Sequence, residues 1–481
     1  MNSNTEILYQ QRLSRYLTAM RNEKPDMIPI RPFAAEFTAK YAGISCQQVT
    51  HDYNQAFEAV RRCATDFDWD AIVSNMVYVW TGLTQAIGIR YYGTPGIDVP
   101  ANVGFQYLEP PEGKEFMRED EYDELIDDPT AFLYNKWLPR VSTQIADIGA
   151  PSTFESNLAL VKGAMAMNSY FNAFGEQNRR LKEEYGTVPA ISGIFKAPFD
   201  ILADKLRGYI GLTMDMYTQP EKVLKACEAL MPHLYNVASG SADSMKQVPI
   251  GYWMHRGCIP FVSAGQFESH YWPTVRPIIE ELWKDGKQTL FYGEGNWGHH
   301  LESFLELPEQ SIVFHVDTGD LFDTHRRIGH QFCISGGVPN TLMSYGKSED
   351  IKACVKRIVE EVAKEGGYIM DCSAIIQNDA EIENMRLLTN YTRELGVYSQ
   401  GSAPAITNIH EPVKNRFTSS QDNLGMGKFL SENEKVGVCI PFSQREAELT
   451  RGDGDPKLIE TIWNDIEGMG NSFIWQCLLS F

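Results

Sequence analysis

The chain has 481 residues and a formal net charge of −20, with 43% hydrophobic and 22% charged residues. These proportions are ordinary for a globular protein with a sizeable core, and the acidic excess argues against a nucleic-acid partner. No apolar run reaches the roughly 18 residues that a membrane-spanning helix needs, so we expect no membrane partner.

The N-terminus and the cysteines both predict a cytoplasmic protein. The opening segment, MNSNTEILYQQRLSRYL, is polar and has no apolar signal core. The nine cysteines are dispersed without a pairing rhythm, which is typical of thiols kept reduced inside the cell.

The pattern of predicted helices and strands changes near residue 185. Before it, helical patterns are mixed with irregular stretches; after it, short β-rich runs alternate with helical ones. The best-defined helical pattern covers 348–367, where apolar residues recur at helical spacing between a capping Ser348 and a terminal Gly366. The clearest strands are predicted at 188–199, 247–255, 289–297, 311–319, 332–339 and 368–376.

This alternation predicts an α/β fold. Because it is sustained over nearly two hundred residues, we expect a (β/α)8 TIM-type barrel with N-terminal helical additions over residues 1–404. Residues 405–481 are expected to form a C-terminal extension packed on the barrel. A doubly wound sheet is the alternative, although no glycine-rich nucleotide-binding motif follows a strand.

Polar residues at the predicted strand ends are the candidates for chemistry. In a barrel of this type, reactive side chains lie at the carboxyl ends of the strands. Tyr292 and Glu294 end one predicted strand, His315 and Asp317 end the next, and Cys372 ends a later one. We expect these side chains to point into the same opening, at the carboxyl ends of the barrel strands.

Glu294, His315 and Cys372 form a coherent set of zinc ligands. Zinc accepts carboxylate, imidazole and thiolate, and a catalytic site keeps its fourth position open. Asp317 could replace one ligand or orient His315 from outside the metal shell. Other interpretations stay open: Glu294 as a substrate-binding carboxylate, His315 as a hydrogen-bonded core histidine, and Cys372 as an inert buried thiol.

Five stretches carry a family resemblance, including the string GGVP…GGYI…EN. The chain resembles the uroporphyrinogen decarboxylase superfamily and, within it, the cobamide-dependent methyltransferases. It departs from the decarboxylases, because Arg31 stands alone where they carry an arginine-rich motif. The stretches that carry the resemblance are 28–45, 191–208, 267–296, 334–370 and 379–388.

The resemblance also bears on the metal ligands. In the coenzyme M methyltransferases of this superfamily, a His-x-Cys pair and a late cysteine hold zinc. Cys372 matches the late cysteine, whereas Tyr292 and Glu294 stand where the His and first Cys would be. His315 is our own addition, supported by its likeness to the Glu/His pattern of corrinoid O-demethylase methyltransferases.

A carboxylate in place of a thiolate leaves a harder zinc ion, better suited to an oxygen ligand. The resemblance therefore implies transfer of a methyl group from a methoxylated, aryl methyl ether substrate to the Co(I) cobamide of a partner corrinoid protein. Tyr292 would be the catalytic residue, bonding or protonating the leaving oxygen. The aromatic segments 76–80 and 251–256 are candidate walls for the ring.

Two further functions stay open, as does a homo-oligomeric state. One is transfer in the opposite direction, from a methylcobamide to a thiol. The other is a non-catalytic member that binds a tetrapyrrole or a corrinoid protein. This chain has no corrinoid-binding DxHxxG string, so the cobamide is expected to arrive on the partner.

Overall fold

The computed structural model of the chain describes residues 3–74, 81–89, 92–111, 113–398, 426, 430, 433–446 and 454–479. Its central element is a parallel sheet in the order β10-β9-β8-β7-β6-β5, and β1 pairs with β4, also in parallel. A small antiparallel pair, β2–β3, lies apart from it. The strands are β1 (Ala71–Ile72), β2 (Tyr92–Gly93), β3 (Gln106–Tyr107), β4 (Val188–Pro189), β5 (Ile194–Lys196), β6 (Ile250–Met254), β7 (Thr289–Gly293), β8 (Ile312–Val316), β9 (Cys333–Gly336) and β10 (Tyr368–Ile369).

The segment 27–34 closes the sheet into a ring. Ile30 forms a parallel bridge with Met370 next to β10, and its carbonyl accepts the main-chain N–H groups of Asp70 and Ala71 at the start of β1. β1 pairs with β4, and the chain runs on from β4 into β5, which pairs with β6. The predicted barrel is confirmed, and the doubly wound alternative is wrong.

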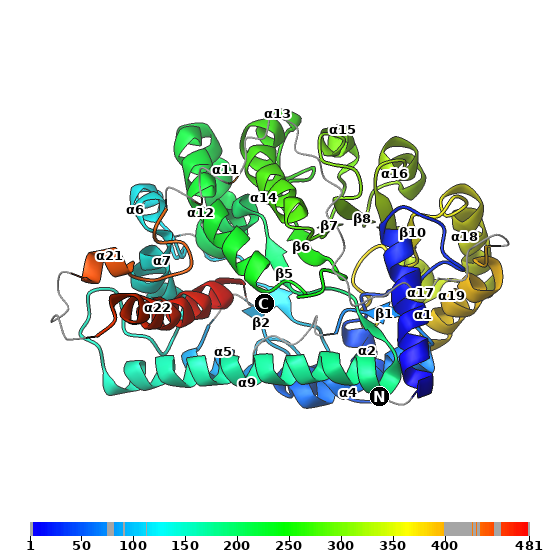
Figure 1. Ribbon diagram of the computed structural model, residues 1–481, viewed down its shortest axis with the longest axis horizontal. Coiled ribbons are helices and arrows are strands. Elements are labelled where there is room, and N and C mark those ends of the chain that lie inside the picture. Colours follow the sequence, from blue (N-terminus) through cyan, green and yellow to red (C-terminus); the bar gives the residue numbers. More distant parts are fainter. Residues whose placement is uncertain are drawn as a thin grey trace.

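Helices cover the outside of this ring (Figure 1). From α11 to α19 they form an arc around the strands, and the long α9 runs along the opposite side, beside α1. The helices are α1 (Ser3–Met20), α2 (Glu36–Ala42), α3 (Cys46–His51), α4 (Tyr53–Asp66), α5 (Thr81–Ile87), α6 (Tyr122–Asp127), α7 (Pro129–Phe132), α8 (Leu138–Val141), α9 (Phe154–Tyr185), α10 (Pro198–Ile201), α11 (Tyr209–Thr218), α12 (Pro220–Gly240), α13 (Ala264–Gln266), α14 (Trp272–Lys284), α15 (Leu301–Phe304), α16 (Leu321–Ile328), α17 (Asn340–Tyr345), α18 (Ser348–Glu361), α19 (Ile382–Leu395), α21 (Phe442–Arg445) and α22 (Pro456–Leu479).

The sequence explains why these elements form. β6, β7 and β8 are buried along their whole length, as expected of parallel strands covered on both faces. In α18, Ile351, Val355 and Ile358 recur at helical spacing and are all buried. The predicted strand at 188–199 is divided into β4 and β5, and Pro198 begins α10 because its fixed φ suits a first helical turn.

The last helix packs on the barrel. In α22, the Trp475 ring stacks on His233 of α12 with 4.8 Å between centroids, and its Nε1 donates to Thr130 of α7 at 3.1 Å. The predicted boundary at residue 404 falls in 399–425, outside the described residues. None of the described helices is long and apolar enough to cross a membrane.

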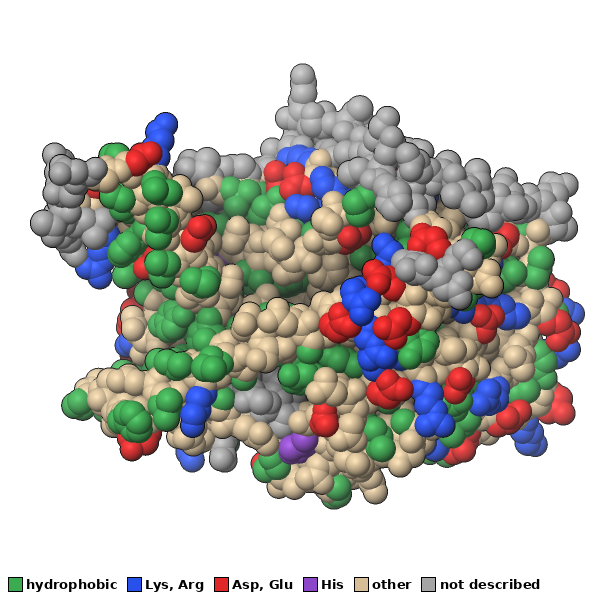
Figure 2. All heavy atoms as spheres, turned by 60° about the horizontal axis from the view of Figure 1, so that its bottom comes forward, with side chains coloured by type: hydrophobic (Ala, Val, Ile, Leu, Met, Phe, Trp, Pro, Cys, Tyr) green, Lys and Arg blue, Asp and Glu red, His purple; other side chains and the backbone are tan. Residues whose placement is uncertain are grey.

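One face of the molecule has a charged half and a more hydrophobic half. Figure 2 shows acidic and basic side chains interspersed on its right, while hydrophobic side chains gather on its left, the side on which α9 begins in Figure 1. On α9, four apolar residues at helical spacing are exposed: Phe154, Leu158, Val161 and Met165.

Candidate functional site

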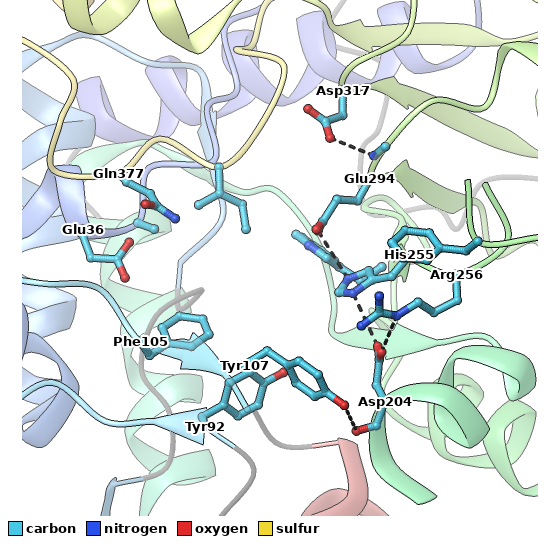
Figure 3. A pocket seen from close by; sticks show the side chains of 15 residues that line it. Glu36, Tyr92, Phe105, Tyr107, Asp204, His255, Arg256, Glu294, Asp317 and Gln377 are labelled. Carbon is cyan, nitrogen blue, oxygen red and sulfur yellow. Dashed lines mark hydrogen bonds and ion pairs between the residues drawn. The ribbon is translucent and has the colours of Figure 1, made fainter. Parts of the chain in front are cut away.

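A cavity of about 390 Å³ opens at the carboxyl ends of the barrel strands. This is the end at which barrels of this type hold their substrates. Figure 3 shows acidic and basic side chains on one side of the cavity, aromatic rings along another, and a further acid at the opposite side. The described residues that line it are Ala35, Glu36, Tyr92, Phe105, Tyr107, Asp204, Trp253, His255, Arg256, Phe261, Glu294, Gly295, Asp317, Ile375 and Gln377.

Glu294 follows β7 directly and presents its carboxylate to this cavity. Its Oε2 lies 3.4 Å from Nε2 of His255, which follows β6. The Glu294 side chain is 47% accessible and lines the cavity. Burial in this enclosure raises the pKa of the Glu294 carboxyl to about 7. Near neutral pH, Glu294 can therefore both hold and release a proton.

His255 is held in place from its other ring nitrogen. Nδ1 lies 3.5 Å from Asp204 Oδ2 and 3.5 Å from Lys196 Nζ. Burial, together with the Lys196 charge, lowers the pKa of His255 well below its usual range, so the imidazole is neutral. Its Nε2 is buried and has no hydrogen-bond partner among the described residues. Nε2 is therefore a polar atom left available to a molecule in the cavity.

Asp204 joins the basic groups beneath His255. It lies on η2 (Leu202–Leu206), accepts Arg256 Nε at 2.7 Å and contacts Lys196 Nζ at 3.2 Å. Burial alone would raise the pKa of Asp204, but Lys196, His255 and Arg256 together hold it well below its usual value. The carboxylate stays charged and fixes the side chains around it.

Aromatic rings form the walls between the two polar ends of the cavity. The Arg256 guanidinium lies over the Phe261 ring at 4.7 Å and over the Tyr107 ring at 5.7 Å. Tyr92 and Phe105 meet edge to face at 5.3 Å. Such walls suit a flat, apolar molecule with few polar groups.

The opposite end of the cavity carries a second acid. Glu36, the first residue of α2, is only 2% exposed, and it lies beside Gln377 in Figure 3. The main-chain N–H of Phe105 donates to its carboxylate, but burial outweighs this and raises the pKa of Glu36 to about 7. Gly104 leaves room for the group, because a Cβ there would lie 2.5 Å from Oε1 of Glu36.

The predicted metal ligands are divided between this cavity and the interior of the barrel. Glu294 and Asp317 line the cavity, whereas Tyr292, His315 and Cys372 are at most 1% exposed and do not. Tyr292 stacks on His315 with 4.3 Å between centroids, and its hydroxyl has no partner among the described residues. Asp317 accepts the Gly295 N–H at 2.8 Å and does not orient His315.

Both ring nitrogens of His315 are engaged by protein groups. Nε2 lies 2.8 Å from the Ser373 carbonyl, which can only accept, so this nitrogen carries the proton. Nδ1 is then the acceptor, and the Ser335 hydroxyl donates to it at 3.1 Å. The same oxygen, Ser335 Oγ, accepts a hydrogen bond from Arg31 at 2.9 Å. Asp371 completes the group, 3.5 Å from Arg31. We call Arg31, His315, Ser335 and Asp371 the Arg31 cluster; all four are at most 1% exposed.

These observations do not fit a zinc ion on the predicted ligands. Among the described residues, no group of three or more His, Cys, Asp and Glu side chains is arranged to hold a metal. The lone pair of His315 Nδ1 accepts a hydrogen bond from Ser335. Burial raises the pKa of Cys372 well above its usual range, which favours the thiol over the thiolate that binds zinc.

The family of the chain follows from its sequence. The model of the family described as uroporphyrinogen decarboxylase (URO-D) matches residues 141–395, which is more than half of the chain. The chain belongs to the URO-D family. This family resemblance, expected from the sequence, is confirmed.

The fold of this URO-D protein is also found in a solved structure. A methyltransferase from Methanosarcina mazei superimposes with a TM-score of 0.53 at 15% identity, covering 79% of this chain and 97% of its own. At that identity the likeness supports the fold. A search of curated proteins found no match.

Sequence reasoning missed several cavity residues of this URO-D protein. His255 and Arg256 follow β6, and Glu36 follows the segment that closes the ring. The strand-end rule, applied to every strand, would have found them. Of the two predicted aromatic walls, 251–256 contributes Trp253, His255 and Arg256 to the cavity, although only its aromatic residues were expected there, and 76–80 lies outside the described residues.

Proposed function

We propose that this URO-D protein is a methyltransferase that demethylates a methoxylated aromatic compound. The observation that carries the proposal is the pair of Glu294 and His255 facing a cavity with aromatic walls. Membership of the URO-D family and the shared fold with a methyltransferase support it. The proposed setting is the cytoplasm, in keeping with nine cysteines that are all free thiols.

The size of the cavity bears on how the methyl group would leave. A volume of about 390 Å³ suits one substituted ring and is far too small for a corrinoid macrocycle. We therefore assign the cavity to the substrate and the space outside its opening to a corrinoid carried by a partner protein. When bound, that group would supply the electron pair that accepts the methyl group.

The residues of this chain would act on the leaving oxygen. As the bond between methyl carbon and oxygen breaks, its electron pair stays on the oxygen, which becomes a phenolate. Glu294 can place its proton on that oxygen, and His255 Nε2, 3.4 Å from Glu294, can stabilise the charge that develops. Lys196 can donate to Nδ1 of His255, which leaves the proton of the neutral ring on Nε2, and the aromatic walls orient the substrate ring.

The test is methyl transfer from 4-methoxyphenol to cob(I)alamin, followed by absorbance and by release of 1,4-dihydroxybenzene. Glu294→Gln keeps the shape of the side chain but removes the acidic proton, so we expect kcat to fall about 10²- to 10⁴-fold. The matched control is Glu302→Gln, because Glu302 is 68% exposed and pairs with Arg327 on the surface.

Two results would contradict the proposal. One is the absence of methyl transfer from every methoxylated aromatic tested, although these compounds bind to the folded protein. The other is a Glu294→Gln variant with the same rate as the Glu302→Gln control, which would remove the acid from the mechanism.

A further inference from the structure

The two ends of the cavity offer opposite hydrogen-bond chemistry. At one end, His255 Nε2 and the guanidinium of Arg256 can donate, and Glu294 lies beside them. At the other end lies Glu36, whose carboxylate accepts. Figure 3 shows these groups on opposite sides, with Tyr92, Phe105 and Tyr107 along the edge between them.

Glu36 has acceptor capacity that the protein does not use. Above its pKa of about 7 the Glu36 carboxylate is ionised and offers about four lone-pair sites, whereas its donors among the described residues are main-chain N–H groups, including that of Phe105. At 2% exposure, the carboxylate is removed from bulk water but borders the cavity. A buried acceptor of this kind favours a ligand that brings a donor to it.

We infer that Glu36 is a specificity-determining residue, which selects substrates carrying a hydrogen-bond donor at the end of the ring opposite the methoxy group. The inference rests on the proposed function and names its substrate class: methoxyarenes with a free hydroxyl or amino group across the ring. The donor binds Glu36, and the ether oxygen then faces His255 and Glu294 at the other end.

The surroundings of Glu36 argue against a purely structural role. Among the described residues, no Lys or Arg pairs with it, unlike the buried acids Asp204 and Asp371, and no side-chain hydroxyl donates to it, as Tyr271 does to the buried Asp200. A carboxylate needed only for stability would be better served by an ion-pair partner or by an uncharged side chain, since burying it alone is costly.

The test compares two ligands in the absence of any methyl acceptor, so that binding is measured without turnover. Isothermal titration calorimetry at pH 8, where Glu36 is ionised, gives the affinities of 4-methoxyphenol, which has the donor, and 1,4-dimethoxybenzene, which lacks it. We expect the unmodified protein to prefer 4-methoxyphenol by about tenfold or more, as for a hydrogen bond to a charged group. Glu36→Gln should lose most of this preference.

Two further variants test whether the position of the Glu36 carboxylate is what matters. Gly104→Ala leaves Glu36 in the sequence but places a Cβ against its Oε1, so the carboxylate is displaced and the preference should fall as well. Glu365→Gln, at an acid that is 81% exposed and paired with Lys24, is the control and should keep it. Thermal unfolding checks that each variant is folded.

The outcomes separate this inference from the proposed function. Equal affinity for the two ligands in the unmodified protein overturns the inference, as does a preference that survives both Glu36→Gln and Gly104→Ala. If the preference depends on Glu36 but no methyl group is transferred, the specificity site stands and the proposed function fails. If both ligands are demethylated with equal kcat/KM, only the inference fails.

Discussion

Two groups of polar side chains lie near the same end of the barrel, and only one of them is exposed to the cavity. The cavity holds Glu294, His255 and Glu36, each with polar atoms that face an open volume. The Arg31 cluster lies within the ring of strands, where its four side chains contact one another and are sealed from solvent. Charged residues at a barrel mouth therefore divide into groups that face the cavity and groups that contact one another between the strands.

The largest predicted effect is a loss of stability when the Arg31 cluster is broken. Asp371→Ala would leave the guanidinium of Arg31, at 0% exposure, without its counter-charge. Removing one member of a buried pair costs about 3–5 kcal/mol, so the free energy of unfolding should fall by that amount. Urea denaturation measures it. Ligand affinity of the folded fraction should not change, and a weakened affinity with unaltered stability would reverse the assignment.

His315→Phe is expected to have an intermediate effect. The new ring preserves the stack on Tyr292 but removes the hydrogen bonds to Ser335 and Ser373, which should cost about 1–3 kcal/mol of stability. Methyl transfer by the folded variant should persist.

The same variant also tests the sequence-based metal prediction. Elemental analysis of the unmodified protein and of His315→Phe decides the matter. If the unmodified protein holds zinc in stoichiometric amount and the variant loses both metal and activity at unchanged stability, then His315 is a ligand after all.

The smallest predicted effect is a pH dependence that arises in the cavity. Burial raises the pKa of Glu294 to about 7, so the carboxyl is protonated below that pH and ionised above it. Because the protonated form is the acid, kcat/KM for 1,4-dimethoxybenzene, which brings no donor to Glu36, should be constant at low pH and fall about tenfold per unit well above pH 7. The decline should be lost in Glu294→Gln, where residual activity allows measurement, and retained in Glu36→Gln. A profile that rises through pH 7 would indicate a base instead.

The fold could be predicted because its signal is spread along the chain. Buried runs such as β7 and β8 alternate with amphipathic helices such as α18, and this pattern is local. The short closing segment could not be found in this way. Ile30 joins the ring through single bridges, and its partner Met370 lies far away in the sequence.

The site could be predicted in part, and the division has a geometric cause. Glu294 and Asp317 come one residue after β7 and β8 end, so their side chains reach the cavity. Tyr292 and His315 lie within the same strands, where they pair in register and stack inside the ring. Tyr292 and Glu294 are two residues apart, as are His315 and Asp317, so the difference is one of depth along the strand rather than of face, and sequence spacing alone did not place the strand ends closely enough.

The closure of the ring has a consequence for how this protein is made. The N–H of Phe33 donates to Asp371, 338 residues further along the chain. During synthesis the segment 27–34 therefore leaves the ribosome long before β10 exists. Ile30 can pair early with Asp70 and Ala71, but the main-chain groups that face β10 stay unpaired until residues 368–376 emerge. Contacts between such distant residues form slowly, and exposed strand edges invite aggregation in the interval. A growing chain of this kind would gain from chaperones that cover residues 27–34 until β10 emerges.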